Sequence, residues 1–242
     1  MKKLRKRLSC LSLLSLSLLY LSLLSLSLLS LSLYVQAREQ KPVLLAVVGD
    51  SISYGTTLSE LSQRYGDVTV SRLNQNVVYR NYSVPGATCV DLTRWVATGK
   101  LNLPNFLSLP HSAAVVVIQC GGNDIFHGSS AAVAYANVLR LVGDTKLSCK
   151  TPVTVLVATQ TDVAPSFISE ATRSTFNASI AGGATAGGYT VLNWGADSLL
   201  GCGGCSSSSI YFAADNVHPT QRGHEIMAGQ YLAGALNALN IH

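Results

Sequence analysis

Five short apolar runs recur along the chain, and they restrict its fold more than any other feature. They cover residues 43–48, 77–82, 113–118, 153–158 and 189–192. They are rich in β-branched residues and apolar on both faces, as strands buried between helix layers are. The longer segments between and after them predict helices at 59–73, 89–98, 130–147, 166–181 and 219–239. This alternation predicts an α/β domain with a five-stranded parallel sheet, right-handed crossovers and helices on both faces.

No linker or shift of composition divides residues 38–242, so we expect a single domain there. The last helix is the clearest, because its apolar residues follow helical spacing after Pro219, a residue suited to a first helical turn. The glycine-rich segment 182–188 is expected to end a helix and turn into the fifth strand. It lacks the lysine of a phosphate-binding loop, and no strand is followed by Gly-x-Gly-x-x-Gly, which argues against a nucleotide enzyme.

The net charge of +5 comes from the N-terminus. Five of the 17 basic residues precede Leu8, and those that remain equal the 12 acidic residues in number. A neutral body gives no electrostatic footprint for nucleic acid or an anionic membrane. We therefore expect no nucleic-acid partner, no membrane contact beyond the N-terminal segment, and a monomer.

The basic start and the apolar run 8–35 have the layout of a secretory signal. Small residues at Val35 and Ala37 predict cleavage after Ala37, so residues 1–37 would be a signal peptide. The run is longer than an ordinary signal core, which leaves an uncleaved membrane anchor as the alternative. In either case the basic residues stay inside, and residues 38–242 are expected outside the cytoplasm.

Beyond Cys10 the chain has an odd number of cysteines, so at least one thiol stays free or pairs between chains. These are Cys89, Cys120, Cys149, Cys202 and Cys205. Cys202 and Cys205 are close enough in sequence to form a structural disulfide in an oxidising compartment. An unremarkable loop, a redox pair or a metal site are the weaker alternatives, and the pairing of the other cysteines stays open.

Small and polar residues follow three of the predicted strands and precede the last helix. The clusters are Gly49-Asp50-Ser51, Asn81-Tyr82-Ser83-Val84-Pro85-Gly86, Gly121-Gly122-Asn123-Asp124 and Asp215-Asn216-Val217-His218. Ligands of open parallel sheets bind at the carboxyl ends of the strands, so we expect these clusters to meet at one edge. Together they supply a hydroxyl, an imidazole, a carboxylate and donors for an oxyanion.

With these four clusters the sequence resembles the SGNH or GDSL hydrolase family, whose blocks centre on Ser, Gly, Asn and His. The resemblance spans residues 49–219 and implies a three-layer α/β/α sandwich of flavodoxin-like type. It implies that Ser51 is the nucleophile, that His218 is the base and that Asp215 is its partner. Gly86 and Asn123 would join the Ser51 N–H as oxyanion donors. No cofactor or metal is implied. The Gly-x-Ser-x-Gly elbow of α/β-hydrolases does not fit, because Ser53 replaces its second glycine.

The expected function is that of an extracytoplasmic serine esterase that hydrolyses acyl esters through an acyl-enzyme on Ser51. Its substrate would be a small-molecule, lipid or glycan ester, and the short domain suggests an open cleft that prefers short or medium acyl chains. A carbohydrate O-acetylesterase, an acyltransferase with the same triad, and a catalytically silent binding domain are the alternatives.

Several neighbouring polar residues are expected to have structural or surface roles. We expect Asp50 and Asp124 to hold loop backbone and Asn81 to be structural. The histidines His111, His127 and His224 are expected at the surface.

Overall fold

The computed structural model describes residues 20–30, 41–73 and 76–239, which belong to two compact units, Met1–Lys41 and Pro42–His242. In the first unit, residues 20–30 are helical, and Ser25, Ser27 and Ser30 each donate a side-chain hydrogen bond to the carbonyl three residues earlier. None of the helices in the described ranges is both long and apolar enough to cross a bilayer. The other residues of the predicted signal peptide or anchor, and its cleavage site, lie outside the described residues.

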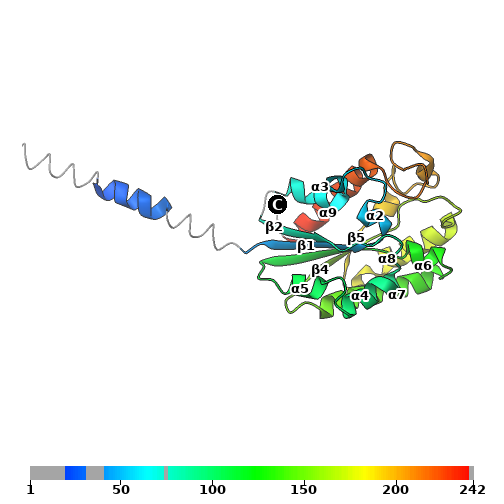
Figure 1. Ribbon diagram of the computed structural model, residues 1–242, viewed down its shortest axis with the longest axis horizontal. Coiled ribbons are helices and arrows are strands. Elements are labelled where there is room, and N and C mark those ends of the chain that lie inside the picture. The colour runs from blue at the N-terminus through cyan, green and yellow to red at the C-terminus, as the bar shows by residue number, and fades with distance from the viewer. Residues whose placement is uncertain (1–19, 31–40, 74–75, 240–242) are drawn as a thin grey trace, which may run out of the picture. The chain divides into compact units, whose positions relative to one another are not determined.

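The second unit is built on a five-stranded sheet in which every neighbouring pair is parallel (Figure 1). The strands are β1 (Val43–Gly49), β2 (Val77–Asn81), β3 (Ala113–Gln119), β4 (Thr154–Ala158) and β5 (Thr190–Leu192). Their order is β2-β1-β3-β4-β5, so β3 lies at the centre and β1 and β4 lie on either side of it. The predicted parallel sheet is confirmed, with strand ends within one residue of the expected ones.

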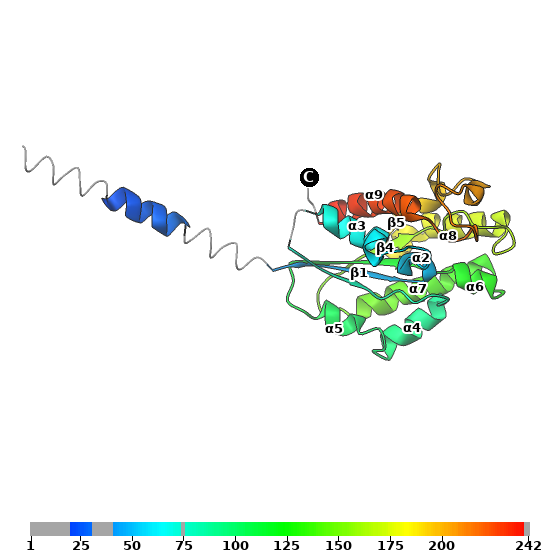
Figure 2. The same cartoon turned by 45° about the horizontal axis from the view of Figure 1, so that its top comes forward.

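Helices cover both faces of the sheet, which confirms the three-layer α/β/α sandwich (Figure 2). On one face lie α3 (Tyr65–Arg72) and α9 (Gln221–Ala238). On the other lie α4 (Cys89–Ala97), α5 (Leu103–Leu107), α7 (Ala131–Leu147) and α8 (Glu170–Gly187). Shorter elements are α2 (Ser51–Tyr54), α6 (Gly122–Phe126) and the 3₁₀ turns η1 (Leu61–Gln63), η2 (Trp194–Ala196) and η3 (Cys205–Ser207).

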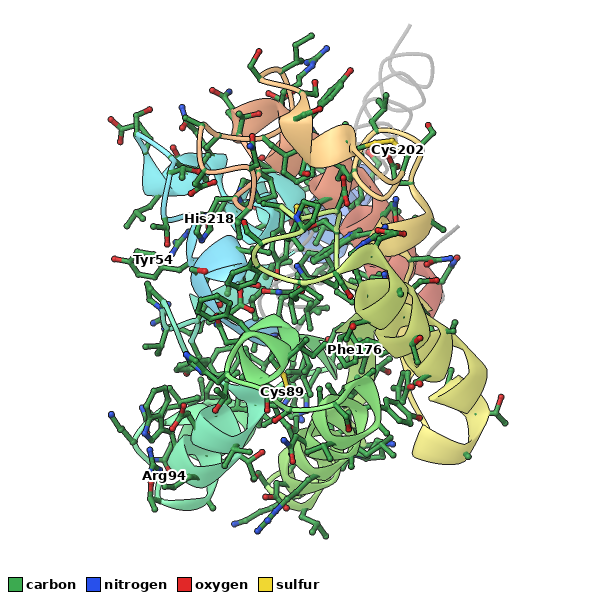
Figure 3. The ribbon with its side chains drawn as sticks, turned by 90° about the vertical axis from the view of Figure 1, so that its right-hand side faces the viewer. Tyr54, Cys89, Arg94, Phe176, Cys202 and His218 are labelled. Carbon is green, nitrogen blue, oxygen red and sulfur yellow. A yellow bond between two sulfur atoms is a disulfide. The ribbon has the colours of Figure 1, made fainter. Side chains whose placement is uncertain are left out.

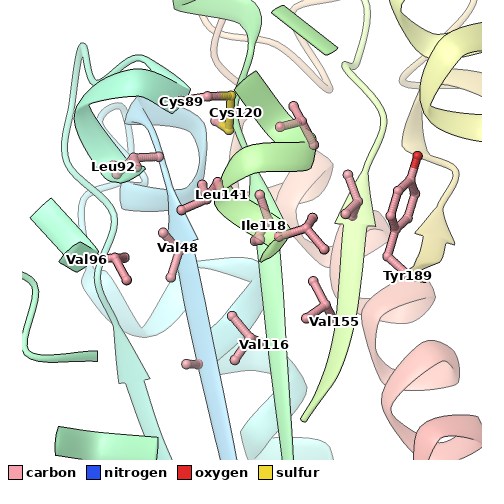
Figure 4. Close-up of a cluster of buried hydrophobic side chains, with 14 of the residues drawn as sticks. Val48, Cys89, Leu92, Val96, Val116, Ile118, Cys120, Leu141, Val155 and Tyr189 are labelled. Carbon is pink, nitrogen blue, oxygen red and sulfur yellow. A yellow bond between two sulfur atoms is a disulfide. The ribbon is translucent and has the colours of Figure 1, made fainter. Parts of the chain in front are cut away.

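The core is divided between the two faces by the alternation of strand side chains. In β1, Leu44, Ala46 and Val48 join the cluster under α4 and α7, whereas Leu45 and Val47 join the cluster under α3 and α9. Figure 4 shows the first cluster, with Val48 and Ile118 on neighbouring strands. Apolar burial on both faces explains why the strand runs do not alternate with polar residues.

Two disulfides are present in the second unit, and they join Cys202 to Cys205 and Cys89 to Cys120. The predicted disulfide between Cys202 and Cys205 is therefore confirmed. Among the described cysteines Cys149 keeps a free thiol.

Three expectations about the helices are wrong. The glycine-rich segment 182–188 is not a turn, because α8 continues to Gly187 and ends at Gly188, whose φ is 65°. The close approach of α8 to Tyr135 of α7 leaves no room for a Cβ at Gly183, which explains the glycine inside a helix. Pro219 lies before α9, whose N-cap is Thr220. The predicted 59–73 helix is split into η1 and α3 at Arg64, whose backbone is extended.

Candidate active site

Ser51 lies in the first turn of α2, directly after the carboxyl end of β1, which lies between β2 and β3 in the sheet. Asp50 caps this helix, and its Oδ1 accepts a hydrogen bond of 2.9 Å from the Ile52 N–H. Gly55 ends the helix after one turn with φ of 77°. A sharp strand-to-helix turn therefore presents the Ser51 hydroxyl at the sheet edge, next to backbone N–H groups that have no acceptor within the helix.

His218 and Asp215 lie beside Ser51, as the sequence predicts. His218 Nε2 is 2.8 Å from Ser51 Oγ, and His218 Nδ1 is 2.6 Å from Asp215 Oδ2. Figure 3 looks onto the carboxyl edge of the sheet and labels His218 and Tyr54, the last residue of α2, on the same side of the view. The side chain of His218 is largely buried, whereas that of Asp215 is more open to solvent.

Asp215 is held ionised by its own loop. Partial burial pushes its pKa upward, but hydrogen bonds from the His218 N–H, the His218 ring and the Val217 N–H outweigh this, and the pKa lies below its ordinary value. Asn216 turns the chain between them with φ of 55°. The tight turn lets one carboxylate bind both the backbone and the ring of His218, which fixes the orientation of the imidazole.

The two other residues expected at this site are Gly86 and Asn123. They lie on two segments that a hydrogen bond connects. Asn123 is buried at the start of α6, and its Nδ2 donates to the carbonyl of Ala87 at 3.0 Å. Gly86 has φ of 77° with open space where a Cβ would lie, so its backbone conformation and not crowding favours glycine. The Val84 N–H donates to Gly49 O at 2.9 Å, which ties this segment to the end of β1.

A second histidine also follows an aspartate by three residues, but the structure separates that pair. Asp124 is buried, and its carboxylate accepts hydrogen bonds from the Cys89 N–H at 2.7 Å and Asn137 Nδ2 at 2.9 Å. His127 is exposed, as predicted. Both Asp–His pairs have the same spacing in the sequence, but only Asp215 and His218, whose turn faces Ser51, form a hydrogen-bonded pair.

A buried polar network that no sequence motif indicates lies behind Ser51. Gln119 Nε2 donates to Asp50 Oδ2 at 3.1 Å, and Gln119 Oε1 accepts from Ser53 Oγ at 2.7 Å. Ser53 Oγ also lies 2.8 Å from the Tyr65 hydroxyl. Burial raises the pKa of Asp50 to about 6, although hydrogen bonds from Ile52 and Gln119 oppose the rise. The network holds Asp50, and through it the turn that carries Ser51. The expected structural role of Asp50 is confirmed.

One of the predicted surface histidines is buried in the core and not at the surface. His224 is only 1% exposed, and its Nδ1 accepts from the Tyr65 N–H at 3.2 Å while its ring stacks on Tyr65. Burial lowers the pKa of His224 to about 3, so it is neutral and links α9 to α3. His111 is half-buried, and its ring nitrogens contact Leu109 O and Thr151 Oγ1. Asn81 has the expected structural role, since its Nδ2 donates to Ser53 O at 2.9 Å.

An aromatic pair is formed by Phe126, the exposed last residue of α6, and by Phe167, a half-buried residue of the segment between β4 and α8. Phe126, three residues after Asn123, is 51% exposed and stacks on Phe167 with ring centroids 4.5 Å apart. The Phe167 loop is joined to the Asp215 turn, because the Ala164 N–H donates to Asn216 O at 2.8 Å. Large exposed aromatics beside a site favour contact with an apolar part of a ligand.

The assembled groups are those of a serine nucleophile, a base and a carboxylate that orients the base. No cluster of three or more His, Cys, Asp or Glu side chains in the described part of the chain is arranged to hold a metal ion. The chemistry that these groups can perform is acyl transfer from an ester to a hydroxyl and then to water.

Comparison with known proteins places this arrangement in context. A family model, the GDSL-like Lipase/Acylhydrolase family, matches residues 47–226. A comparison with curated protein sequences gives no significant match.

Solved structures match the fold at low sequence identity. A lipolytic protein of the G-D-S-L family from Veillonella parvula has a TM-score of 0.61 at 19% identity, covering 79% of this chain and 97% of that one. The psychrotrophic esterase EstA from Pseudoalteromonas sp., inhibited by monoethylphosphonate, has a TM-score of 0.62 at 16% identity, with 81% and 98% covered. A lipase/acylhydrolase from Enterococcus faecalis has a TM-score of 0.58 at 16% identity, with 80% and 95% covered.

Proposed function

Because the chain belongs to the GDSL-like lipase/acylhydrolase family, we propose that it is a serine esterase that hydrolyses carboxylic esters through an acyl-enzyme on Ser51. The observation that carries this proposal is the continuous series of contacts from Ser51 Oγ to His218 Nε2 and from His218 Nδ1 to Asp215 Oδ2. An unassisted serine hydroxyl is a weak nucleophile, so a base must accept its proton during attack.

In the first step Ser51 Oγ attacks the ester carbonyl while His218 Nε2 takes the hydroxyl proton. His218 then gives this proton to the departing alcohol, leaving an ester between the acyl group and Ser51. A water molecule is activated by His218 in the same way, and its attack releases the acid and restores Ser51. Asp215 stays ionised throughout, which fixes the ring and stabilises the imidazolium.

In each step negative charge collects on the former carbonyl oxygen, and we assign its stabilisation to three donors. These are the N–H groups of Ser51 and Gly86 and the Nδ2 of Asn123. The Ser51 N–H is unsatisfied within α2, and Asn123 Nδ2 keeps a second hydrogen beyond the one that it donates to Ala87 O. Donors already in position stabilise such charge without reorganisation.

The exposed Phe126 ring, stacked on half-buried Phe167, supports an apolar contact with the substrate. We assign this contact to a short or medium acyl group of the substrate. The reason is that the family match covers a single small domain, and the described residues include no inserted helical lid between β5 and α9. This assignment places no restriction on the alcohol part of the ester, so the substrate class includes small-molecule, lipid and glycan esters.

We assign the domain to an oxidising compartment outside the cytoplasm. Two disulfides support this assignment, since disulfides persist mainly in secreted and periplasmic proteins. The basic and apolar N-terminal segment is the corresponding export signal or anchor.

The test is hydrolysis of p-nitrophenyl acetate, butyrate, octanoate and palmitate by the wild-type protein and by Ser51→Ala, with Ser71→Ala on the exposed side of α3 as the control. We expect turnover of the short and medium esters by wild type and Ser71→Ala and none above background by Ser51→Ala. Turnover that survives in Ser51→Ala would contradict the mechanism. Folded wild-type protein that turns over none of these esters would favour an O-acetylesterase if it released acetate from acetylated polysaccharide, and a binding domain if it did not.

A further inference from the structure

The buried disulfide joins the two segments that carry the proposed oxyanion donors. Cys89 is three residues after Gly86 and begins α4, and Cys120 is three residues before Asn123 and follows β3. Both cysteines are almost completely buried. Figure 4 shows their bond spanning the gap between the start of α4 and the end of β3. The covalent link therefore lies at the base of both donor segments.

A buried hydrogen bond reinforces the same connection. Asp124, next to Asn123, accepts from the Cys89 N–H at 2.7 Å, so Cys89 is held to the β3 segment by both its sulfur and its backbone. The other carboxylate oxygen accepts from Asn137 of α7 at 2.9 Å. A hydrogen bond that an N–H at the start of a helix donates to a buried carboxylate is among the stronger kinds in proteins.

The donor segment that carries Gly86 has little regular structure to hold it. Residues 82–88, all of them described by the structure, form neither helix nor strand. Gly86 and Gly121 both have positive φ, of 77° and 109°. Oxyanion donors stabilise a transition state only when they are held within a few tenths of an ångström of the required position.

From these contacts we propose that the Cys89–Cys120 disulfide and the Asp124 carboxylate are a positioning device that sets the separation of Gly86 and Asn123. The inference rests on the proposed function, because it assigns a task to groups around the same site. Cys89, Cys120 and Asp124 touch no reacting atom and act through the backbone of the two donor segments.

The second disulfide provides a matched control. Cys202 and Cys205 are three residues apart, and their bond closes a local turn around η3. Removing it also deletes two sulfur atoms and one cross-link, but it leaves both donor segments joined.

The experiment compares Cys89→Ala/Cys120→Ala with Cys202→Ala/Cys205→Ala, each measured well below its own melting temperature. For p-nitrophenyl butyrate we expect the first double variant to lose about 10- to 100-fold in kcat with KM within about twofold of wild type, because a displacement of about 1 Å can cost that much. n-Butylboronic acid forms a tetrahedral adduct with an active serine. Its inhibition constant should rise by the same factor by which kcat/KM falls. The acid limb of the pH profile should not move, since Ser51, His218 and Asp215 are untouched. The control should stay within about twofold of wild type.

An unchanged kcat in folded Cys89→Ala/Cys120→Ala would overturn the proposal, and so would an equal loss in the control. A lower melting temperature with unchanged kcat would mean that the disulfide only stabilises the fold. If the double variant does not fold, Asp124→Asn decides by the same measurements, with the same expected loss in kcat and the same contradicting result. An inactive wild-type protein would refute the proposed function and is distinct from all these outcomes.

Discussion

Ser51 Oγ and His218 Nε2 lie 2.8 Å apart although 167 positions separate the two residues in the sequence. Two further contacts hold the segments that carry them. Thr57 Oγ1 donates to Pro219 O at 3.1 Å, and the Tyr65 N–H donates to His224 Nδ1 at 3.2 Å. The start of α9 is thus fastened to the chain that follows α2, and the packing of α3 against α9 sets the position of His218.

The role of Asp215 can be tested by Asp215→Asn. The variant keeps the size of the side chain but removes the charge that orients His218 and stabilises its protonated form, so we expect kcat for p-nitrophenyl butyrate to fall on the order of 10⁴-fold. Circular dichroism should show a native fold, because Asp215 is partly exposed. A kcat within tenfold of wild type would mean that Asp215 does not assist His218.

Asn123→Ala tests the oxyanion assignment. Loss of the Nδ2 donor should lower kcat by about 10²- to 10³-fold with little change in KM, because the bond forms mainly in the transition state. Asn105→Ala is the control, since Asn105 is an exposed amide that contacts only the neighbouring Asn102 side chain through its own. Equal kinetics for the two variants would exclude Asn123 from the oxyanion site.

Phe126→Ala tests the acyl contact. We expect kcat/KM for p-nitrophenyl octanoate to fall roughly tenfold, because an apolar contact worth about 1.4 kcal/mol is lost, and kcat/KM for the acetate to change little. The control is Leu147→Ala, which removes another highly exposed apolar side chain at the end of α7. A parallel loss for both esters in Phe126→Ala would indicate a general disturbance of α6 and not an acyl site.

Buried His224 makes stability sensitive to acid. Burial lowers its pKa in the folded protein to about 3, from an ordinary value of 6.5. Below pH 6.5 the unfolded chain binds a proton that the folded chain refuses, so stability is lost as pH falls from about 6.5 towards 3. At about 1.4 kcal/mol per pH unit the loss reaches at most about 4 to 5 kcal/mol.

His224→Asn should remove this dependence while its side-chain oxygen still accepts from the Tyr65 N–H. Urea unfolding at pH 4, 5, 6 and 7 should give a flatter stability profile for the variant than for wild type. Identical slopes for the two proteins would show that His224 does not control the acid sensitivity. His111→Asn, at a half-buried position, is the matched control and should keep the wild-type slope.

The sheet could be predicted from the sequence because its strands are buried on both faces. A run such as 113–118 is apolar throughout, which is typical of a strand that is buried on both faces. The chain between two such runs is too long for a hairpin, which favours parallel pairing. The short helices α2, α5 and α6 were not predicted, because one or two turns carry too few residues to show a helical period.

Tertiary packing explains the wrong predictions. Glycine is a poor helix former, but at Gly183 and Gly187 of α8 the close approach of Tyr135 and Leu139 of α7 favours it over larger residues. His224 shares a helix face with Met227, Ala228, Tyr231 and Ala235, all buried, so its helical spacing from the apolar residues could have revealed its burial.

The residues of the candidate site were found from the sequence because they lie next to recognisable strand ends, and the structure brings Ser51, Asp215 and His218 into contact. Two other features could not be found from the sequence. They are the network of Ser53, Gln119 and Tyr65 and the pairing of Cys89 with Cys120. Those contacts join residues that are far apart in the sequence and form no recognisable motif. They meet only because β1, β3 and α4 lie beside one another in the folded domain.

The most direct measurement of the central claim is covalent labelling of the protein with diethyl p-nitrophenyl phosphate, followed by peptide mapping of the adduct by mass spectrometry. We expect one phosphoryl group per molecule, bound to Ser51, with loss of ester turnover in proportion to labelling. An adduct on another residue, or turnover that persists in fully labelled protein, would contradict it.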